Sequence, residues 1–272
     1  MSIITFWSND NIETGQTMSM AAVATHMAIE HNYKILMIDT ANNDKTLEDA
    51  FWSQTKKTIV KQKQDIGSGL SGLIRVIDSN RNSPEVITNY SKIIFKNRLE
   101  LLNGDKMNVE EYKKMQETLQ NIVLLANKYY DYVFIDLKTN IENETTKKIL
   151  SVSDVIVVNI TQRLRNINNF LELKEQEDIF KKDNVILNIG TYNPRLSKYT
   201  SKNIARYMRE KEILFIPYNN TYFEATNEGL VADYFIKFRK VRNVNPNAPF
   251  IEATKKLKNA IIDRVKALQM KI

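Results

Sequence analysis

Six short apolar runs, separated by helix-forming stretches, constrain the fold of this chain more than any other feature of its sequence. The apolar residues in each run are continuous rather than alternating, which is typical of parallel strands buried on both faces. Alternation of strands with helices predicts right-handed crossovers and a three-layer architecture. We therefore predict an α/β fold with a doubly wound, mostly parallel sheet. The runs lie at 3–7, 34–39, 131–136, 154–159, 184–189 and 213–217.

The stretches between these runs are expected to form the covering helices. The helix at 18–30 has apolar residues on nearly every side, which indicates that it is buried. Residues 44–106 are less regular, and we expect one or two helices there, then a hairpin-like edge pair, 92–96 with 99–102. Because repeats and linker-like tracts are absent, residues 1–272 are expected to form a single domain. Further helices are predicted near 108–129, 142–150, 163–181 and 200–210.

The composition limits the chemistry that this chain can carry out. It has no cysteine, which excludes disulfides and thiolate catalysis, and its two histidines, His26 and His31, leave little for a zinc site. We expect both histidines to be packing or surface residues. No run approaches the ~20 apolar residues of a membrane-spanning helix, and the first residues form no basic leader, so we expect a cytoplasmic protein. A net charge of +7 favours acidic partners only weakly, because the charges are scattered.

The segment between the first run and the buried helix has the position of a phosphate-binding loop. In a doubly wound sheet, ligands bind beyond the carboxyl ends of the strands. The segment ends in Gly15-Gln16-Thr17, which is one substitution away from the Gly-Lys-Thr of a P-loop. Gly15, Gln16, Thr17 and Met18 are therefore the candidate residues for binding a nucleotide.

Taken in order along the chain, these motifs resemble those of the ParA/MinD family of deviant Walker ATPases. The similarity spans nearly the whole chain and is carried by the ordered set rather than by any one motif. It implies a P-loop NTPase-like fold, a homodimer, and ATP or ADP bound with Mg²⁺. The elements that carry it are the loop and helix after Phe6-Trp7-Ser8, Lys34–Asp39, Asn103-Gly104, Asp131–Asp136, Ile216-Pro217-Tyr218 and Glu224–Gly229.

The resemblance also implies roles for single residues. Asn188 lies at the position of the family's adenine-side asparagine, and Pro217 belongs to its late Ile-Pro element, so both are candidates for nucleotide binding. Thr17, Asp39 and Asp136 correspond to the residues that hold Mg²⁺ when a nucleotide binds. The residues alone leave a second interpretation open, in which the two aspartates are caps or turn residues and Asn188 satisfies the backbone at a strand end.

Departures from the family's loop argue against ATP hydrolysis. The family reads Lys-Gly-Gly-x-Gly-Lys-Thr-Thr, and this chain has Asn11 for the signature lysine and Gln16 for the P-loop lysine. Ile12 and Glu13 replace two glycines, so side chains occupy space where backbone amides approach an anion. A unit charge at a distance of about 4 Å and an effective dielectric of about 20 is worth about 4 kcal/mol, so a lost lysine and an added carboxylate both oppose binding. Ala41 replaces the second switch aspartate. We expect no meaningful hydrolysis, and weak binding of ATP or ADP with Mg²⁺ stays open.

Two groups of basic residues are candidate surfaces for DNA or a partner. In the resembled family, such surfaces bind DNA non-specifically through its phosphates. A solvated face is the simpler interpretation, and we favour it. The last helix, 249–272, is basic and amphipathic, and packing on the domain is favoured over binding to a membrane. The basic groups are Lys56, Lys57, Lys61 and Lys63, and Lys237, Arg239, Lys240 and Arg242.

These observations favour a degenerate ParA/MinD-like protein with little or no ATP hydrolysis. It would position or scaffold cargo, such as pilus or secretion machinery, a plasmid or a chromosome, together with a protein partner. The degenerate loop is similar to the pilus-associated TadZ-like branch, which usually carries a receiver-like domain ahead of the ATPase-like one. The alternative is a divergent but active ParA-type ATPase for plasmid or chromosome partition that binds DNA non-specifically. A weaker third hypothesis is a protein-binding module that uses residues 44–106.

Overall fold

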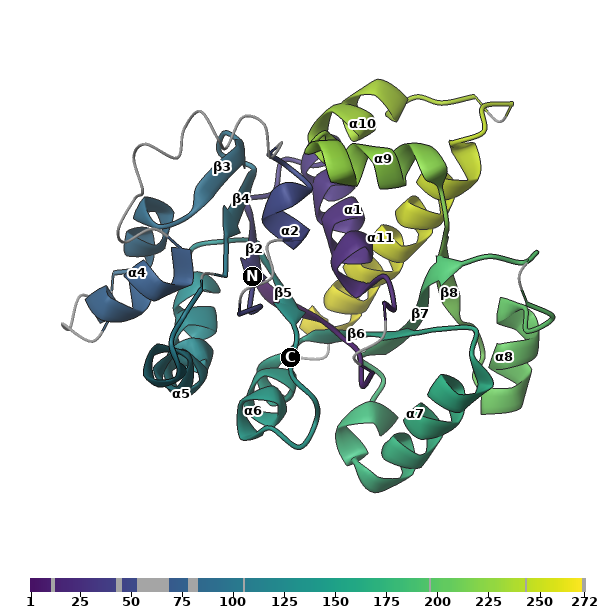
Figure 1. The fold of residues 1–272 in the computed structure, drawn as a ribbon, viewed down its shortest axis with the longest axis horizontal. Coiled ribbons are helices and arrows are strands. Elements are labelled where there is room, and N and C mark those ends of the chain that lie inside the picture. The colour runs from purple at the N-terminus through teal and green to yellow at the C-terminus, as the bar shows by residue number, and fades with distance from the viewer. Residues whose placement is uncertain are drawn as a thin grey trace.

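The fold is built on one sheet, in which the strand order departs from the chain order (Figure 1). A computed structural model describes residues 1–10, 13–42, 46–52, 69–77, 83–104, 106–195, 197–242 and 244–270. The sheet order is β3-β4-β2-β5-β1-β6-β7-β8, and every pair is parallel except the edge pair β3 and β4. The strands are β1 (Ser2–Trp7), β2 (Ile35–Asp39), β3 (Lys92–Phe95), β4 (Leu99–Leu102), β5 (Tyr132–Leu137), β6 (Val155–Ile160), β7 (Val185–Tyr192) and β8 (Leu214–Pro217).

Helices cover both faces of this sheet and complete the predicted three-layer α/β architecture. On one face lie α1 (Gln16–Glu30), α2 (Thr46–Asp49), α9 (Asn220–Glu228), α10 (Val231–Phe238) and α11 (Ala248–Gln269) (Figure 1). On the other lie α4 (Gly69–Ile77), α5 (Val109–Ala126), α6 (Glu144–Val152), α7 (Leu164–Gln176) and α8 (Ser201–Met208). Because successive strand side chains alternate, each face has its own apolar core. Ile4 and Phe6 belong to the first core, and Ile3 and Trp7 to the second.

The strands predicted from the apolar runs are all present, and the predicted edge pair is the antiparallel β3–β4 hairpin. Strand β7 continues to Tyr192, beyond the predicted end at 189, because Tyr192 still pairs with Pro217 of β8. Within the irregular region, the described residues form α2, α4 and the 3-10 helix η1 (Pro84–Asn89). Residues 43–45, 53–68, 78–82 and 105 lie outside the described ranges, and with them the predicted basic group at 56–63.

One predicted helix, at 163–181, is divided in the structure. Helix α7 ends at Gln176, because Glu177 has an extended conformation with φ −114° and ψ 109°. A 3-10 helix, η2 (Asp178–Lys181), follows it. Phe180 of η2 is buried and stacks on Trp7, with ring centroids 5.0 Å apart. The helical pattern of the sequence does not reveal this tertiary contact, which accompanies the break.

The last helix, α11, packs on the domain as predicted. Its apolar stripe, which includes Leu257, Ile261 and Val265, is buried against α1 and β8. Lys258 on the same helix is also buried and forms an ion pair with Glu30 at the end of α1. Among the described helices, none combines the length and the apolar character that crossing a membrane requires.

Candidate functional site

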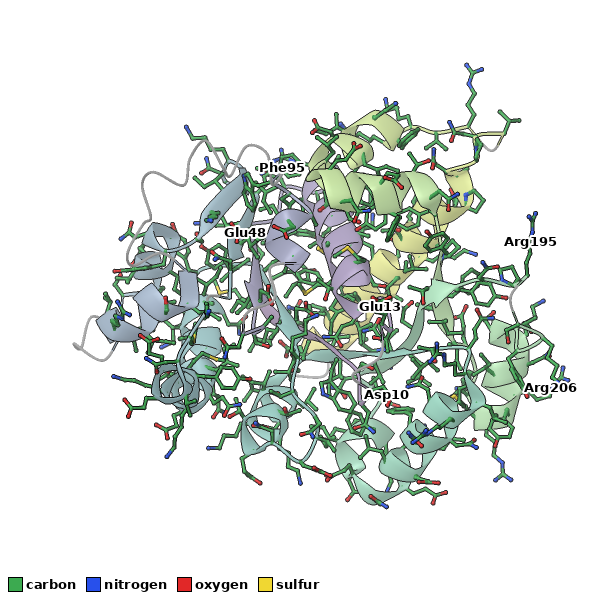
Figure 2. The ribbon with its side chains drawn as sticks, in the orientation of Figure 1. Asp10, Glu13, Glu48, Phe95, Arg195 and Arg206 are labelled. Atoms are coloured by element: carbon green, nitrogen blue, oxygen red, sulfur yellow. The ribbon has the colours of Figure 1, made fainter. Side chains whose placement is uncertain are left out.

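The candidate loop connects the carboxyl end of β1 to the first turn of α1. Asn11 and Ile12, two of the substituted loop positions, lie outside the described residues. Asp10 accepts a hydrogen bond from the side-chain amide of Asn166 in α7, whereas Glu13 is exposed. Figure 2 shows both acidic side chains below the N-terminal end of α1 in this view. An exposed carboxylate beside this helix end is expected to oppose an approaching anion, and that effect stays a prediction.

The end of the loop is packed backbone to backbone against β7. Gly15 has φ +72°, and a Cβ atom at this position would lie 2.5 Å from the carbonyl oxygen of Gly190. A Cβ atom at Gly190 would lie 2.2 Å from the carbonyl oxygen of Thr14. Glycine is therefore required on both sides of this contact, because any side chain would overlap main-chain atoms. Part of the loop's backbone is thus committed to a contact within the protein.

Gln16 replaces the P-loop lysine, and its side chain is directed to the end of β5. Its Nε2 donates to Asp136 Oδ1 at 2.6 Å and to the main-chain oxygen of Leu137 at 3.0 Å. A primary amide has two N–H donors, so both are used within the protein. With only 7% of its surface exposed, Gln16 is held in this arrangement. It offers neither a charge nor a spare donor to a phosphate.

Asp136 is the centre of a buried hydrogen-bonded cluster. The residue is fully buried, and its Oδ2 accepts a hydrogen bond from the Thr17 hydroxyl at 2.8 Å. The ammonium of Lys138 lies 3.0 Å from the same oxygen and also donates to Thr17 Oγ1. Both carboxylate oxygens are therefore engaged, and the negative charge is balanced by a cation of the chain itself. We call Gln16, Thr17, Asp136 and Lys138 the Asp136 cluster.

Sequence reasoning did not identify Lys138. The available signal was a basic residue two positions after the aspartate that ends the Walker B-like strand. Such a lysine is usually directed to solvent, and its return to the buried carboxylate depends on the path of the chain after β5. Its backbone N–H donates to Thr40 Oγ1 at 3.1 Å, which fixes that path.

The carboxyl end of β2 lies beside the cluster. Asp39 is the register partner of Asp136 and is buried, so the structure brings these two predicted residues together. Asp39 Oδ1 also accepts from the backbone N–H of Ala41 at 3.0 Å, a turn that satisfies part of the carboxylate locally. Gly104 approaches so closely that a Cβ atom there would lie 2.2 Å from the Ala41 carbonyl oxygen. Ala41, at the position of the family's second switch aspartate, therefore packs against Gly104.

The predicted adenine-side residues lie on strands farther along the sheet. Asn188 is fully buried in β7, and its Nδ2 donates to Asn159 at 2.8 Å. Its Oδ1 has no hydrogen-bond partner among the described residues. Pro217 is half-buried in the edge strand β8. Met18 is half-buried on α1, and its carbonyl oxygen accepts from the Tyr222 hydroxyl at 2.9 Å. The roles of these residues in nucleotide binding remain predictions.

As folded, the Asp136 cluster does not fit a bound Mg²⁺. The ion requires oxygen ligands at about 2.1 Å in near-octahedral geometry. Thr17 and Asp136 supply such oxygens, but Lys138 and Gln16 already contact them. Elsewhere in the described ranges, no group of three or more histidine, aspartate or glutamate side chains is arranged to hold a metal ion.

Two further features lie outside the loop. The basic side chains predicted as a DNA or partner surface are exposed at the end of α10 and just beyond it, together with Ile236 and Val244. These basic residues are Lys237, Arg239, Lys240 and Arg242.

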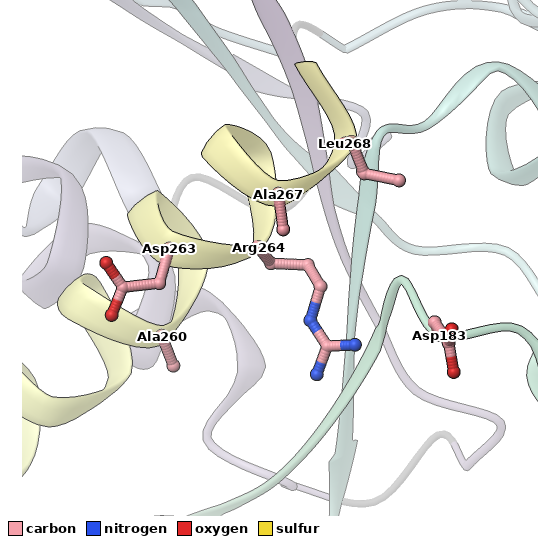
Figure 3. Close-up of a pocket in the computed structure, with 6 residues that line it drawn as sticks. All are labelled: Asp183, Ala260, Asp263, Arg264, Ala267 and Leu268. Atoms are coloured by element: carbon pink, nitrogen blue, oxygen red, sulfur yellow. The ribbon is translucent and has the colours of Figure 1, made fainter. Parts of the chain in front are cut away.

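A pocket of about 320 Å³ lies beside the last turns of α11, near Asp183 ahead of β7 (Figure 3). Asp183 precedes the amino end of a parallel strand, so the pocket lies at the amino ends of the strands, whereas the Asp136 cluster lies at their carboxyl ends. No predicted site residue lines the pocket.

Similarity to known proteins is found at the level of the fold. No family model and no curated protein matches this chain. Among solved structures, a ParA family ATPase from Chlorobium tepidum TLS has a TM-score of 0.69 at 16% identity, covering 94% of this chain and 98% of its own. A chain of the MinC:MinD cell division protein complex from Aquifex aeolicus gives 0.65 at 17% identity, with coverage of 95% and 96%. A putative plasmid partition protein from Borrelia burgdorferi B31, bound to AMPPNP, gives 0.59 at 19% identity, with coverage of 100% and 99%. The chain therefore has the ParA/MinD-type fold that its motifs predicted.

Proposed function

We propose that this protein is a degenerate ParA/MinD-like positioning or scaffold protein that acts with little or no ATP hydrolysis. One observation carries the proposal: Gln16, in place of the P-loop lysine, donates both of its side-chain N–H groups to Asp136 and Leu137. Phosphoryl transfer depends on positioned groups that neutralise the charge developing on the phosphate. In this loop the positive charge is missing, and the group that replaces it faces the protein. The likeness in fold to partition and cell-division proteins supports a role in positioning cargo.

The proposal includes partners that the resemblance implied. The protein would form a homodimer in the cytoplasm and bind a protein of a pilus, secretion or partition system. Any binding of ATP or ADP would be weak, because Gly15, Thr17 and the N-terminal end of α1 are retained while the lysines are not, and Mg²⁺ could accompany the nucleotide only if Lys138 left the Asp136 cluster. Asn188 and Pro217 would lie on the adenine side of such a ligand.

A test of hydrolysis compares the wild-type protein with Asp136→Asn. We expect phosphate release from Mg-ATP to be the same for both proteins and equal to the enzyme-free rate, with or without duplex DNA, because Asn11 and Gln16 stand in place of the two lysines that would neutralise phosphate charge in the loop. Asparagine is nearly isosteric with aspartate, so Asp136→Asn serves as the negative control for hydrolysis. Turnover by the wild type that Asp136→Asn abolishes would overturn the proposal.

A second candidate function is that of a divergent, active ParA-type ATPase that binds DNA non-specifically. The observation in its favour is the exposure of the four basic residues at and beyond the end of α10. Each lysine or arginine that contacts a phosphate contributes about 0.9 to the slope of log K against log salt. If this surface binds DNA, changing all four residues to alanine should reduce that slope by about 3 to 4. The residues are Lys237, Arg239, Lys240 and Arg242.

The control for DNA binding replaces four exposed lysines from other parts of the surface, which should leave most of the slope in place. An unchanged slope in the α10 variant would remove this surface as a DNA site. ATP-dependent dimerisation, followed by light scattering, would favour the active ATPase over the degenerate protein. The control lysines are Lys113, Lys148, Lys182 and Lys211.

A further inference from the structure

A lysine ammonium lies where the ends of β1 and β5 meet the first turn of α1. Lys138 Nζ is 3.0 Å from Asp136 Oδ2 and donates to Thr17 Oγ1. The carboxylate is fully buried, whereas the Lys138 side chain keeps 30% of its surface exposed. A buried carboxylate requires a positive partner, because ionised groups are poorly stabilised away from water. Lys138 supplies that charge from the solvent side of the cluster.

Thr17 and Asp136, which the Lys138 ammonium contacts, are oxygen donors suited to a divalent cation. A cation bridging Thr17 and Asp136 would have to approach both oxygens more closely than the ammonium does, within the volume that the ammonium now occupies. Gln16 contacts the other carboxylate oxygen, so rotation of the carboxylate does not free it. The backbone of Lys138 is held by Thr40, which limits withdrawal of the side chain. Metal and ammonium therefore compete for one position.

We propose that the Lys138 ammonium is a built-in counter-ion that replaces a divalent cation at the Thr17–Asp136 pair in the nucleotide-free protein. The inference rests on the proposed function, since it names the group that stands where a hydrolysing site would hold its metal ion. It assigns Lys138 a role that neither the motifs nor the likeness in fold provides. The consequence is that the folded cluster is complete without Mg²⁺.

The experiment measures the melting temperature of the full-length protein in EDTA and in millimolar Mg²⁺. The wild type should melt at the same temperature in both. Lys138→Met leaves the buried carboxylate without its cation, so the melting temperature in EDTA should fall by about 5 °C. Mg²⁺ should then occupy the vacated position and restore roughly half of that loss. Lys138→Gln carries the same expectation and replaces Lys138→Met if that variant does not fold.

Two controls separate this position from general effects of the ion. The double variant Asp136→Asn/Lys138→Met should lose the response to Mg²⁺, because the carboxylate is gone. Lys147→Met removes a more exposed ion pair, in which Lys147 Nζ is 3.2 Å from Glu177 Oε1, and should leave the melting temperature insensitive to Mg²⁺.

The inference is overturned if Mg²⁺ stabilises the wild type as much as Lys138→Met, or if neither lysine variant responds to it. Its failure is distinguishable from failure of the proposed function. Hydrolysis of Mg-ATP by a wild type whose nucleotide-free form ignores Mg²⁺ would remove only the proposed function. A wild type that is stabilised by Mg²⁺ but does not hydrolyse Mg-ATP would contradict only the inference that Lys138 replaces the metal ion.

Discussion

Replacing Gly15 by alanine is expected to lower the free energy of unfolding by about 3 kcal/mol. Two effects add at this position. The backbone has φ +72°, which costs a residue with a Cβ atom about 1 kcal/mol, and the new atom would lie 2.5 Å from the Gly190 carbonyl oxygen. Relief of that overlap requires the loop to move away from β7, at a cost of about 1–3 kcal/mol. Urea unfolding followed by circular dichroism measures the change.

Gly229→Ala is the matched control for Gly15→Ala. Gly229 also has φ +72°, at the C-terminal end of α9, so alanine there carries the same backbone cost without the contact between the loop and β7. We expect this control to cost about 1 kcal/mol. Equal losses in the two variants would show that the contact between the loop and β7 adds nothing to stability.

Acidification from pH 6.5 to about 4 is expected to lower the free energy of unfolding by about 3 kcal/mol through His26 alone. His26 is 1% exposed and packs on Phe235, with ring centroids 5.5 Å apart. Burial lowers the pKa of His26 from 6.5 to about 4, against the opposing pull of Glu30, whose Oε1 lies 3.3 Å from the histidine Nε2. Lys258 and Lys255 on α11 lower it further.

The sign follows from proton uptake in the two states. Between pH 6.5 and about 4 the unfolded chain binds a proton at His26 that the folded protein excludes. The free energy of unfolding therefore decreases as the pH is lowered, and the contribution of His26 is fully present only above pH 6.5. Chemical unfolding at a series of pH values should show this slope in the wild type and a loss of it in His26→Leu. His31→Gln should keep most of the slope, because His31 is partly exposed. A slope that survives in His26→Leu would assign it to other groups.

Much of the fold could be predicted because it depends on patterns that are local in the sequence. Continuous apolar strands and the all-round apolar helix at 18–30 fixed the layers, and the polar residues at strand ends indicated where a site would lie. Thr17 and Asp136 were predicted to share a site, and their contact at 2.8 Å follows from the meeting of parallel strand ends with the loop after β1. The division of α7 from η2 was missed, because it depends on the burial of Phe180 against a distant strand.

What the sequence by itself determined is the α/β architecture and the loss of the lysines that a P-loop uses, since both are properties of residue identity and order. Only the tertiary structure decided what fills the resulting space. Gln16 and Asp136 are 120 residues apart in the chain, and Lys138 is 121 residues from Thr17. Hydrogen bonds and ion pairs require separations near 3 Å, and no spacing in the sequence specifies distances of that precision between strands that only folding brings together.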